Sequence, residues 1–378
     1  MTTTEDVVRA GGTAPSPRPR RRSAAINRQT GAGWLFVSPT VVILGVFLLL
    51  PVAMAAWVSV SDWGGRGAPW GPDVNFVGTE NYAEVLGGRG LAARDFGTAI
   101  RNNVYYVILV VPLQTALSLT LAFLVNKRAL RGKGFFRTAF YFPSVTSSVA
   151  ITVLWLFLFS ASGAVNAMLA WFSIQGPNWF EDPRGLIHLM LGGGAAPAAL
   201  AQPGLLGIST WEWIAGPSVA MTAFIFMAVF TTSGTFMLLF LAALQAIGEE
   251  TDEAAMVDGA STWQRFWYVT LPMLRPTMFT VLTLGLIGTW QVFDQIYTGS
   301  QGGPSKTTVT PAYLSYDAAF IAQDWGRGSA IAFVLFAIIV VFTLLQRLIL
   351  GQSDPALPSR RQARADRRRQ KEVRNVAQ

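Results

Sequence analysis

The sequence predicts an all-α integral membrane protein with about six transmembrane helices. Hydrophobic residues make up 52% of the 378 residues and charged residues only 13%, which is too apolar for an ordinary soluble domain. The apolar residues gather in segments of roughly 20 residues or more, enough to cross a hydrocarbon core of about 30 Å as helices. Most Lys and Arg residues flank these segments, which is typical of topology signals.

Three regions follow one another along the chain. Residues 1–33 combine arginine with Pro, Ser, Gly and Thr, so we predict a disordered basic cytoplasmic tail. The transmembrane domain is predicted to cover residues 34–350, and residues 351–378 to form a second basic cytoplasmic tail. The predicted spans are residues 34–60, 100–125, 138–160, 218–246, 277–298 and 328–350, with a hairpin over residues 247–275.

Two segments allow a second interpretation. Ala53-Met54-Ala55 resembles a signal-peptide cleavage site, but the apolar run around it is much longer than the usual core of about 7–15 residues, which favours an uncleaved first span. Residues 186–200 could be a seventh helix, but the run is short and broken by glycine. We interpret the outer loop 161–217 as interfacial or packed against protein.

The distribution of Lys and Arg predicts the orientation. The two tails and the loop between the second and third spans hold most of the basic residues, whereas the opposite loops hold few. By the positive-inside rule the protein is a multi-pass protein of the cell membrane with both termini and the 247–275 hairpin in the cytoplasm. The basic C-terminal tail could contact anionic lipid headgroups, and no basic face suggests a nucleic-acid partner.

The segment from Glu253 to Pro272, EAAMVDGASTWQRFWYVTLP, predicts a polar helical hairpin between two spans. Thr251 is expected to cap its first helix, and Gly259 to supply a left-handed turn. Ser261 and Gln264 match the capping box of the second helix. On that helix one bulky face is expected to hold Trp263, Phe266, Trp267 and Thr270, and Pro272 is expected to end the run.

The same segment resembles the EAA loop of binding-protein-dependent ABC importer permeases, E-A-A-x-x-D-G-A-x-x-x-x-x-F-x-x-x-x-L-P, at every fixed position. The resemblance implies a type I ABC importer transmembrane fold. It also implies a cytoplasmic loop that sits in a cleft of an ATP-hydrolysing subunit. An ordinary amphipathic hairpin is the alternative. The coupling residues it implies are Glu253, Ala254, Ala255, Asp258, Gly259, Ala260, Trp263, Phe266, Leu271 and Pro272.

The chain offers little for catalysis. It has no cysteine, which excludes disulfides and thiolate metal sites, and its one histidine, His188, cannot build a histidine metal site alone. The nearest approach to a phosphate-binding loop, residues 302–307, lacks the glycine before lysine and is interpreted as a turn. We therefore expect neither enzymatic activity nor a cofactor in this chain, with ATP and Mg bound by a partner ATPase subunit.

A polar cluster in the fifth predicted span suggests the solute path. In TWQVFDQIY, helical spacing places Trp290, Asp294 and Tyr297 on one face with Gln291 beside them. A carboxylate can accept sugar hydroxyls and aromatic rings stack on sugar rings, whereas an interfacial aromatic belt or subunit packing is the alternative. In the fourth span the hydroxyls that could line the same cavity, or bond back to helix carbonyls, are Thr231, Thr232, Ser233 and Thr235.

The stretch that begins at Phe293, FDQIYTGSQGGP, resembles a segment of carbohydrate-uptake permeases, although Gly299 and Ser300 depart from that pattern. The resemblance predicts one of two membrane subunits of an importer for an oligosaccharide or related polyol. Its expected partners are a homologous permease, a cytoplasmic ATPase dimer and an external solute-binding protein. Two alternatives stay open: a cargo such as a phosphorylated polyol, an oxyanion, a polyamine or a peptide, and a membrane scaffold or lipid-modifying enzyme without an ATPase partner.

Overall fold

The computed structural model describes residues 22–87, 90–127, 130–192, 200, 202 and 204–350. Apart from two isolated β-bridges, the regular elements of these residues are all helical. The chain divides into two compact units, residues 1–55 and 56–378. The predicted all-α architecture is confirmed, while the predicted tails beyond residues 22 and 350 lie outside the described residues.

The first unit is a continuous helical run. It comprises α1 (Arg22–Leu44), the π-helical turn η1 (Gly45–Leu49) and the first part of α2 (Leu50–Val58), within which the unit boundary falls. Residues Gly33–Val58 are long and apolar enough to cross a membrane, in agreement with the first predicted span. Residues 22–33 are helical, so their predicted disorder is wrong. Helix formation is cooperative, and the helix of the apolar segment continues into these residues because they include alanines and arginines, which favour helix.

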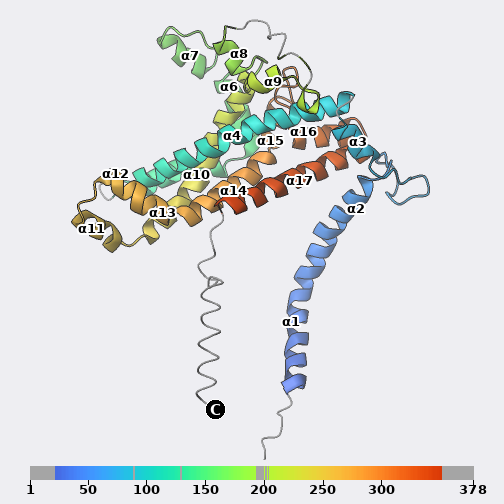
Figure 1. Ribbon diagram of the computed structural model, residues 1–378, viewed down its shortest axis with the longest axis horizontal. Coiled ribbons are helices and arrows are strands. Elements are labelled where there is room, and N and C mark those ends of the chain that lie inside the picture. Colours follow the sequence, from blue (N-terminus) through green and yellow to red (C-terminus); the bar gives the residue numbers. More distant parts are fainter. Residues whose placement is uncertain are drawn as a thin grey trace, which may run out of the picture. The chain divides into compact units, whose positions relative to one another are not determined.

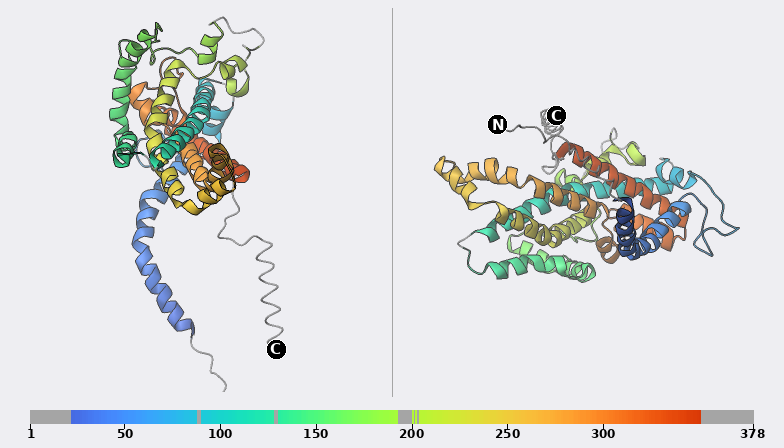
Figure 2. Two further views of the ribbon diagram at one scale, coloured as in Figure 1. Left: turned by 90° about the vertical axis from the view of Figure 1, so that its left-hand side faces the viewer. Right: turned by 90° about the horizontal axis from the view of Figure 1, so that it is seen from below.

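Four long helices of the second unit run alongside one another (Figures 1 and 2): α4 (Leu91–Asn126), α10 (Val219–Ala246), α14 (Arg275–Trp290) and α17 (Trp325–Leu350). Helix α10 is apolar on nearly all sides and packs against α4, α14 and α5 (Lys133–Val145). Three apolar clusters fill the spaces between helices, around Phe224, Phe240 and Trp290 respectively.

The third predicted span is not one straight helix. It consists of α5 and α6 (Ser148–Leu158), which meet at an angle of 97°. Pro143 removes a backbone donor near the end of α5, and Thr146 adopts an extended conformation after it. The described residues therefore contain four helices long and apolar enough to cross a membrane, or up to six if each of two bent pairs forms one span.

The fifth predicted span, residues 277–298, is also interrupted. Helix α14 ends at Trp290, and α15 (Asp294–Gly299) is a separate short helix. Between them Phe293 has φ −136° and ψ −58°, which is incompatible with a continuing α-helix. The prediction of a single helix through residue 298 is wrong, because periodicity does not reveal where backbone geometry breaks.

Short helices connect and cover the long ones. The described part of loop 161–217 holds α7 (Ala164–Trp171), α8 (Leu186–Met190), the 3₁₀ turn η2 (Leu205–Gly207) and α9 (Thr210–Ile214). None of these described helices is long enough to cross a membrane. Residues 193–199 of the candidate seventh helix lie outside the described residues, so the loop remains a prediction there. Three further elements pack around α17: α3 (Glu80–Leu86), α16 (Pro311–Tyr316) and the π-helical η4 (Asp317–Ile321).

Candidate functional site

The predicted hairpin is present at one end of the helical bundle (Figure 1). Helix α11 (Glu249–Val257) leads into a turn at which Gly259 has φ +77°, as predicted. The amide of Ala260 donates to the carbonyl of Ala255 and that of Gly259 to Met256, both at 3.0 Å. This paired arrangement is the Schellman motif, which satisfies the last carbonyls of α11 and sets the direction of the next helix.

The predicted N-terminal cap is correct for the second helix of the hairpin and wrong for the first. The capping box on α12 (Thr262–Arg265) is confirmed, because Ser261 Oγ accepts from the Gln264 amide at 3.3 Å and Gln264 Oε1 accepts from the Ser261 amide at 2.8 Å. The expected cap of α11 by Thr251 is wrong. The extended residue is Gly248, and the Thr251 amide already donates to its carbonyl.

Pro272 does not end the second helix of the hairpin. The helix continues from α12 through the π-helical η3 (Phe266–Thr270) and α13 (Leu271–Met273), and then bends by 67° into α14. The wider π turn lies immediately before Pro272 and accommodates a residue that cannot donate to the preceding turn. The expected stop at Pro272 is corrected to Met273.

Aromatic rings hold the second helix together and attach it to the bundle. Trp263 lies 5.9 Å from Phe266 and 5.5 Å from Trp267, measured between ring centroids, which confirms that these three side chains cluster. Phe266 also packs edge-on against Phe123 of α4 at 5.3 Å. Arg265 Nη1 binds Asp252 Oδ2 of α11 at 2.7 Å, so the two helices of the hairpin are joined as well.

The tip of the hairpin exposes large apolar side chains. The exposed fractions are 88% for Val257, 79% for Tyr268 and 68% for Trp263. Glu253, together with Lys133, lines a hollow of about 650 Å³ between the hairpin and the ends of α4 and α10. Among the other predicted coupling residues, Ala254, Asp258 and Gly259 are exposed, and Ala255, Ala260, Phe266, Leu271 and Pro272 are half-buried. A cluster of exposed apolar groups on an anchored element is typical of a docking surface.

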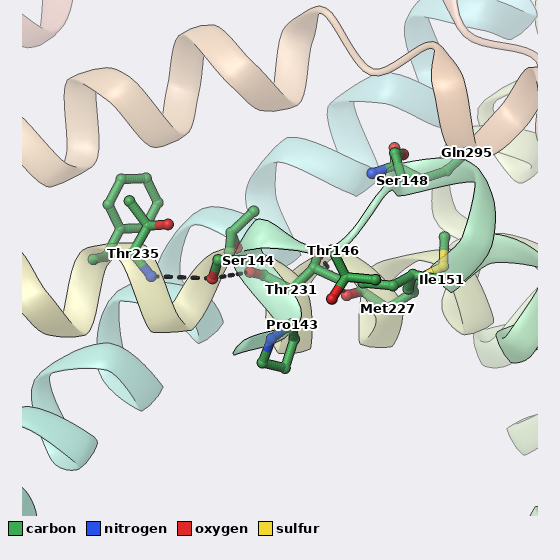
Figure 3. A pocket seen from close by; sticks show the side chains of 11 residues that line it. Pro143, Ser144, Thr146, Ser148, Ile151, Met227, Thr231, Thr235 and Gln295 are labelled. Atoms are coloured by element: carbon green, nitrogen blue, oxygen red, sulfur yellow. Dashed lines mark hydrogen bonds between the residues drawn. The ribbon is translucent and has the colours of Figure 1, made fainter. Parts of the chain in front are cut away.

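Two adjoining cavities lie beside α10, and together they are called the polar cavity. The first, of about 300 Å³, is lined from the α5–α6 break by Ser144, Thr146 and Ser148, and from α10 by Thr231 and Thr235 (Figure 3). The second, of about 270 Å³, lies between α4, α10 and the break after α14. The residues that line both are Thr232, Phe236 and Gln295.

The predicted path residues separate in the structure. Gln291 and Asp294 line the second cavity. Trp290 is only 2% exposed and packs against Phe342 of α17 at 5.3 Å, within an apolar cluster. Tyr297 stacks on Phe293 at 5.4 Å. The prediction that Trp290, Asp294 and Tyr297 share one helical face is wrong, because the helix ends between the first and the second of them.

The hydroxyl residues of α10 also lie in two different surroundings. Thr231, Thr232 and Thr235 line the first cavity, whereas Ser233 faces α4, where Ser118 Oγ donates to its carbonyl at 3.0 Å. Sequence reasoning missed Ser144, Ser148, Gln114 and Gln295 as lining residues. The proline at 143 was the available signal for the α5–α6 break, and a glutamine within the apolar run of α4 was the signal for Gln114.

The lining chemistry suits a neutral, hydroxyl-rich molecule. Hydroxyl and amide groups supply both donors and acceptors, Asp294 supplies one carboxylate, and Tyr106, Phe236 and Phe293 supply aromatic rings. Lys and Arg are absent from the residues that line these two cavities. The arrangement can bind and orient a solute but provides no nucleophile paired with a base.

Residues 114–351 match the family model described as binding-protein-dependent transport system inner membrane component. The chain is 31% identical to the lactose transport system permease protein LacF of Rhizobium radiobacter over 83% of this chain and 92% of that protein. It is 30% identical to the trehalose/maltose transport system permease protein MalF of Thermococcus litoralis, over 84% and 93% of the two chains.

A similar fold occurs in a bacterial alginate ABC transporter solved in complex with an alginate pentasaccharide-bound periplasmic protein. The superposition has a TM-score of 0.64 at 19% sequence identity and covers 87% of this chain and 96% of that one.

Proposed function

As the chain belongs to the family of binding-protein-dependent transport system inner membrane components, and is therefore the permease rather than the ATPase of an ABC importer, we propose that its cargo is a sugar or oligosaccharide. The observation that carries this proposal is the polar cavity, lined by hydroxyls, amides, three aromatic rings and one carboxylate. A phosphorylated polyol or an oxyanion would need basic groups, which these linings lack. The names of the lactose and trehalose/maltose permeases support the same cargo class.

The hairpin is proposed to transmit the ATPase cycle to the helices. Its exposed tip, with Val257, Gly259 and Trp263, would enter a cleft of a cytoplasmic ATPase dimer, which binds ATP and Mg. The contact of Phe266 with Phe123 and the bend into α14 would pass movement on to α4 and to the helix next to Asp294. The other predicted coupling residues would form the hairpin and its contact surface for the ATPase. They are Glu253, Ala254, Ala255, Asp258, Ala260, Leu271 and Pro272.

The partners follow from that role. We propose a homologous second permease that completes the path, an external solute-binding protein that delivers the sugar, and a lipid bilayer around the apolar helices. Both termini and the hairpin would be cytoplasmic, because the basic residues concentrate on that side.

Cysteine labelling tests the orientation in this naturally cysteine-free chain. Thr262→Cys on the hairpin and Ser305→Cys in the turn before α16 are both exposed, and Thr262 is preferred to Ser261 because Ser261 caps α12. An impermeant reagent should label the Ser305→Cys variant in intact cells and the Thr262→Cys variant only after the membrane is opened. Labelling of both variants in intact cells would mean that the proposed topology is wrong.

Transport by the reconstituted complex tests the cargo. The permease pair, the ATPase and the solute-binding protein in proteoliposomes should take up labelled lactose, maltose or trehalose only with ATP and the binding protein. Glycerol phosphate, spermidine and a dipeptide serve as competing solutes. Uptake of one of these and of no sugar would refute the proposed cargo, and a chain that purifies without any ATPase would favour a membrane scaffold.

A further inference from the structure

We infer that Gln114 of α4 is a specificity-determining residue whose side-chain amide binds a hydroxyl of the transported solute; this rests on the proposed sugar cargo. Gln114 is 1% exposed and lines the second cavity together with Gln291 and Asp294. It lies on a helix that contributes no other amide or carboxylate side chain to that cavity. A glutamine in an apolar membrane helix is costly to bury and is best explained by a polar partner.

The amide of Gln114 has one bonded end and one end without a partner. Thr232 Oγ1 lies 2.6 Å from Gln114 Oε1 and 2.7 Å from the Ala228 carbonyl, whereas Gln114 Nε2 has no hydrogen-bond partner among the described residues. A hydroxyl has a single proton to donate, and the two ends of an amide can be interchanged. If the amide were reversed, Thr232 would donate to Ala228 and accept from Gln114, and the carbonyl oxygen would be the unpaired end. Either assignment leaves one polar atom unsatisfied.

The unpaired end points at a glycine. A Cβ added to Gly285 of α14 would lie 2.3 Å from Gln114 Nε2, so only glycine leaves room for the amide there. Gly285 lines the second cavity as well, and so does its neighbour Gly288. The unsatisfied atom therefore lies in the wall of the cavity, at the contact between α4 and α14.

A solute hydroxyl fits this position under either assignment. Because a hydroxyl both donates and accepts, it pairs with an amide N–H or with an amide carbonyl. A small movement of α4 relative to α14 at the Gly285 contact during the transport cycle would uncover the amide to the cavity. Thr232 would keep the other end of the amide oriented throughout.

Gln346 of α17 provides a matched comparison. It is also buried, and one end of its amide, Oε1, has no partner within the described part of the chain, while its Nε2 donates to Thr283 Oγ1 at 3.0 Å. Gln346 is not among the residues that line the polar cavity. A purely structural glutamine should behave like Gln346 in every assay.

Cysteine accessibility in the assembled importer tests the position of Gln114 without knowledge of the sugar. The chain has no native cysteine, so Gln114→Cys, Gln346→Cys and Ser118→Cys each introduce one thiol. Ser118 lies one turn from Gln114 and is buried against Ser233. A small charged thiol reagent should modify the Gln114→Cys variant in at least one nucleotide state, and the other two variants in none. Modification of the thiol at position 114 no faster than of the two control thiols in every state would overturn the inference.

Transport measurements test the recognition itself. Gln114→Leu should raise the KM for the imported sugar about two- to tenfold, the loss expected for one hydrogen bond between neutral groups, while assembly and thermal stability stay normal. Gln346→Leu should leave KM unchanged. An unchanged KM for Gln114→Leu, or a failure of this variant to assemble, would contradict the inference. If the wild-type complex carries no sugar, the proposed cargo and the sugar-binding role both fail, and an accessible thiol in Gln114→Cys would then identify a path residue for another solute.

Discussion

The hairpin and the polar cavity depart from the usual distribution of side chains in opposite directions. The hairpin exposes large apolar groups such as Val257 and Trp263, whereas the cavity encloses polar ones such as Gln114 and Thr232. Each arrangement is unfavourable in an isolated chain. Both are explained if the hairpin is covered by a protein partner and the cavity is filled by a polar solute. The apolar tip then matches an apolar protein surface, and the polar lining matches the polar groups of the solute.

Trp290→Ala is expected to have the largest effect, and on stability. Trp290 packs with Phe342 in an apolar cluster, so its truncation should cost about 3–5 kcal/mol of folding free energy and reduce recovery of the complex. This replaces the loss of sugar stacking that the sequence suggests. Thermal unfolding in detergent is the measurement, with Tyr297→Ala as the exposed aromatic control. A stable Trp290→Ala complex with impaired transport would return Trp290 to the solute path.

Asp294→Asn should weaken solute binding within the cavity without affecting assembly. Loss of a charge-assisted hydrogen bond is worth about 1.5–3 kcal/mol, which corresponds to roughly a ten- to hundredfold rise in the half-saturating sugar concentration. Basal ATP hydrolysis should persist because the hairpin is unchanged. Asp317→Asn in η4 is the control, since Asp317 is not among the cavity-lining residues. Normal transport kinetics in Asp294→Asn would move the path to another helix.

Gly259→Val should uncouple ATP hydrolysis from transport. An added Cβ meets no atom of the described residues within 4 Å, apart from the chain neighbours of Gly259. The expected obstacle is the φ of +77°, a conformation that costs a residue with a side chain about 1–2 kcal/mol and a branched one more. Sugar-stimulated ATPase activity should fall about tenfold or more with normal membrane insertion. Gly248→Val is the matched control, because Gly248 also has open space but an extended backbone. Equal activities of the two variants would sink the proposed role of the turn.

The Arg265–Asp252 ion pair should matter least. Asp252 is 54% exposed, so a 2.7 Å contact of this kind contributes only about 0.2–1 kcal/mol. Arg265→Met and Asp252→Asn, alone and combined, should each change stimulated ATPase activity less than about fivefold, and a double-mutant cycle gives the coupling. A loss comparable to that of Gly259→Val would show that the ion pair is as important as the turn for the active shape of the hairpin.

The hairpin was largely predictable because its interactions are local. The left-handed Gly259 and the Ser261–Gln264 capping box depend on residues only a few positions apart, and both were confirmed. The errors at Thr251 and Pro272 concern where a helix begins and ends. There, backbone geometry at Gly248 and a π turn before Pro272 override side-chain preference.

The amino-acid sequence alone predicts the all-α membrane class, the long apolar helices and the hairpin, because each follows from composition and short-range periodicity. The cavity, in contrast, depends on how the folded helices are arranged. The helices break after Val145 and after Trp290. As a result of the second break, Trp290 lies in the core while Asp294 lines the cavity. Gln114 contacts Gly285, which lies far from it in the sequence. Such contacts arise from helix packing, which no local pattern encodes.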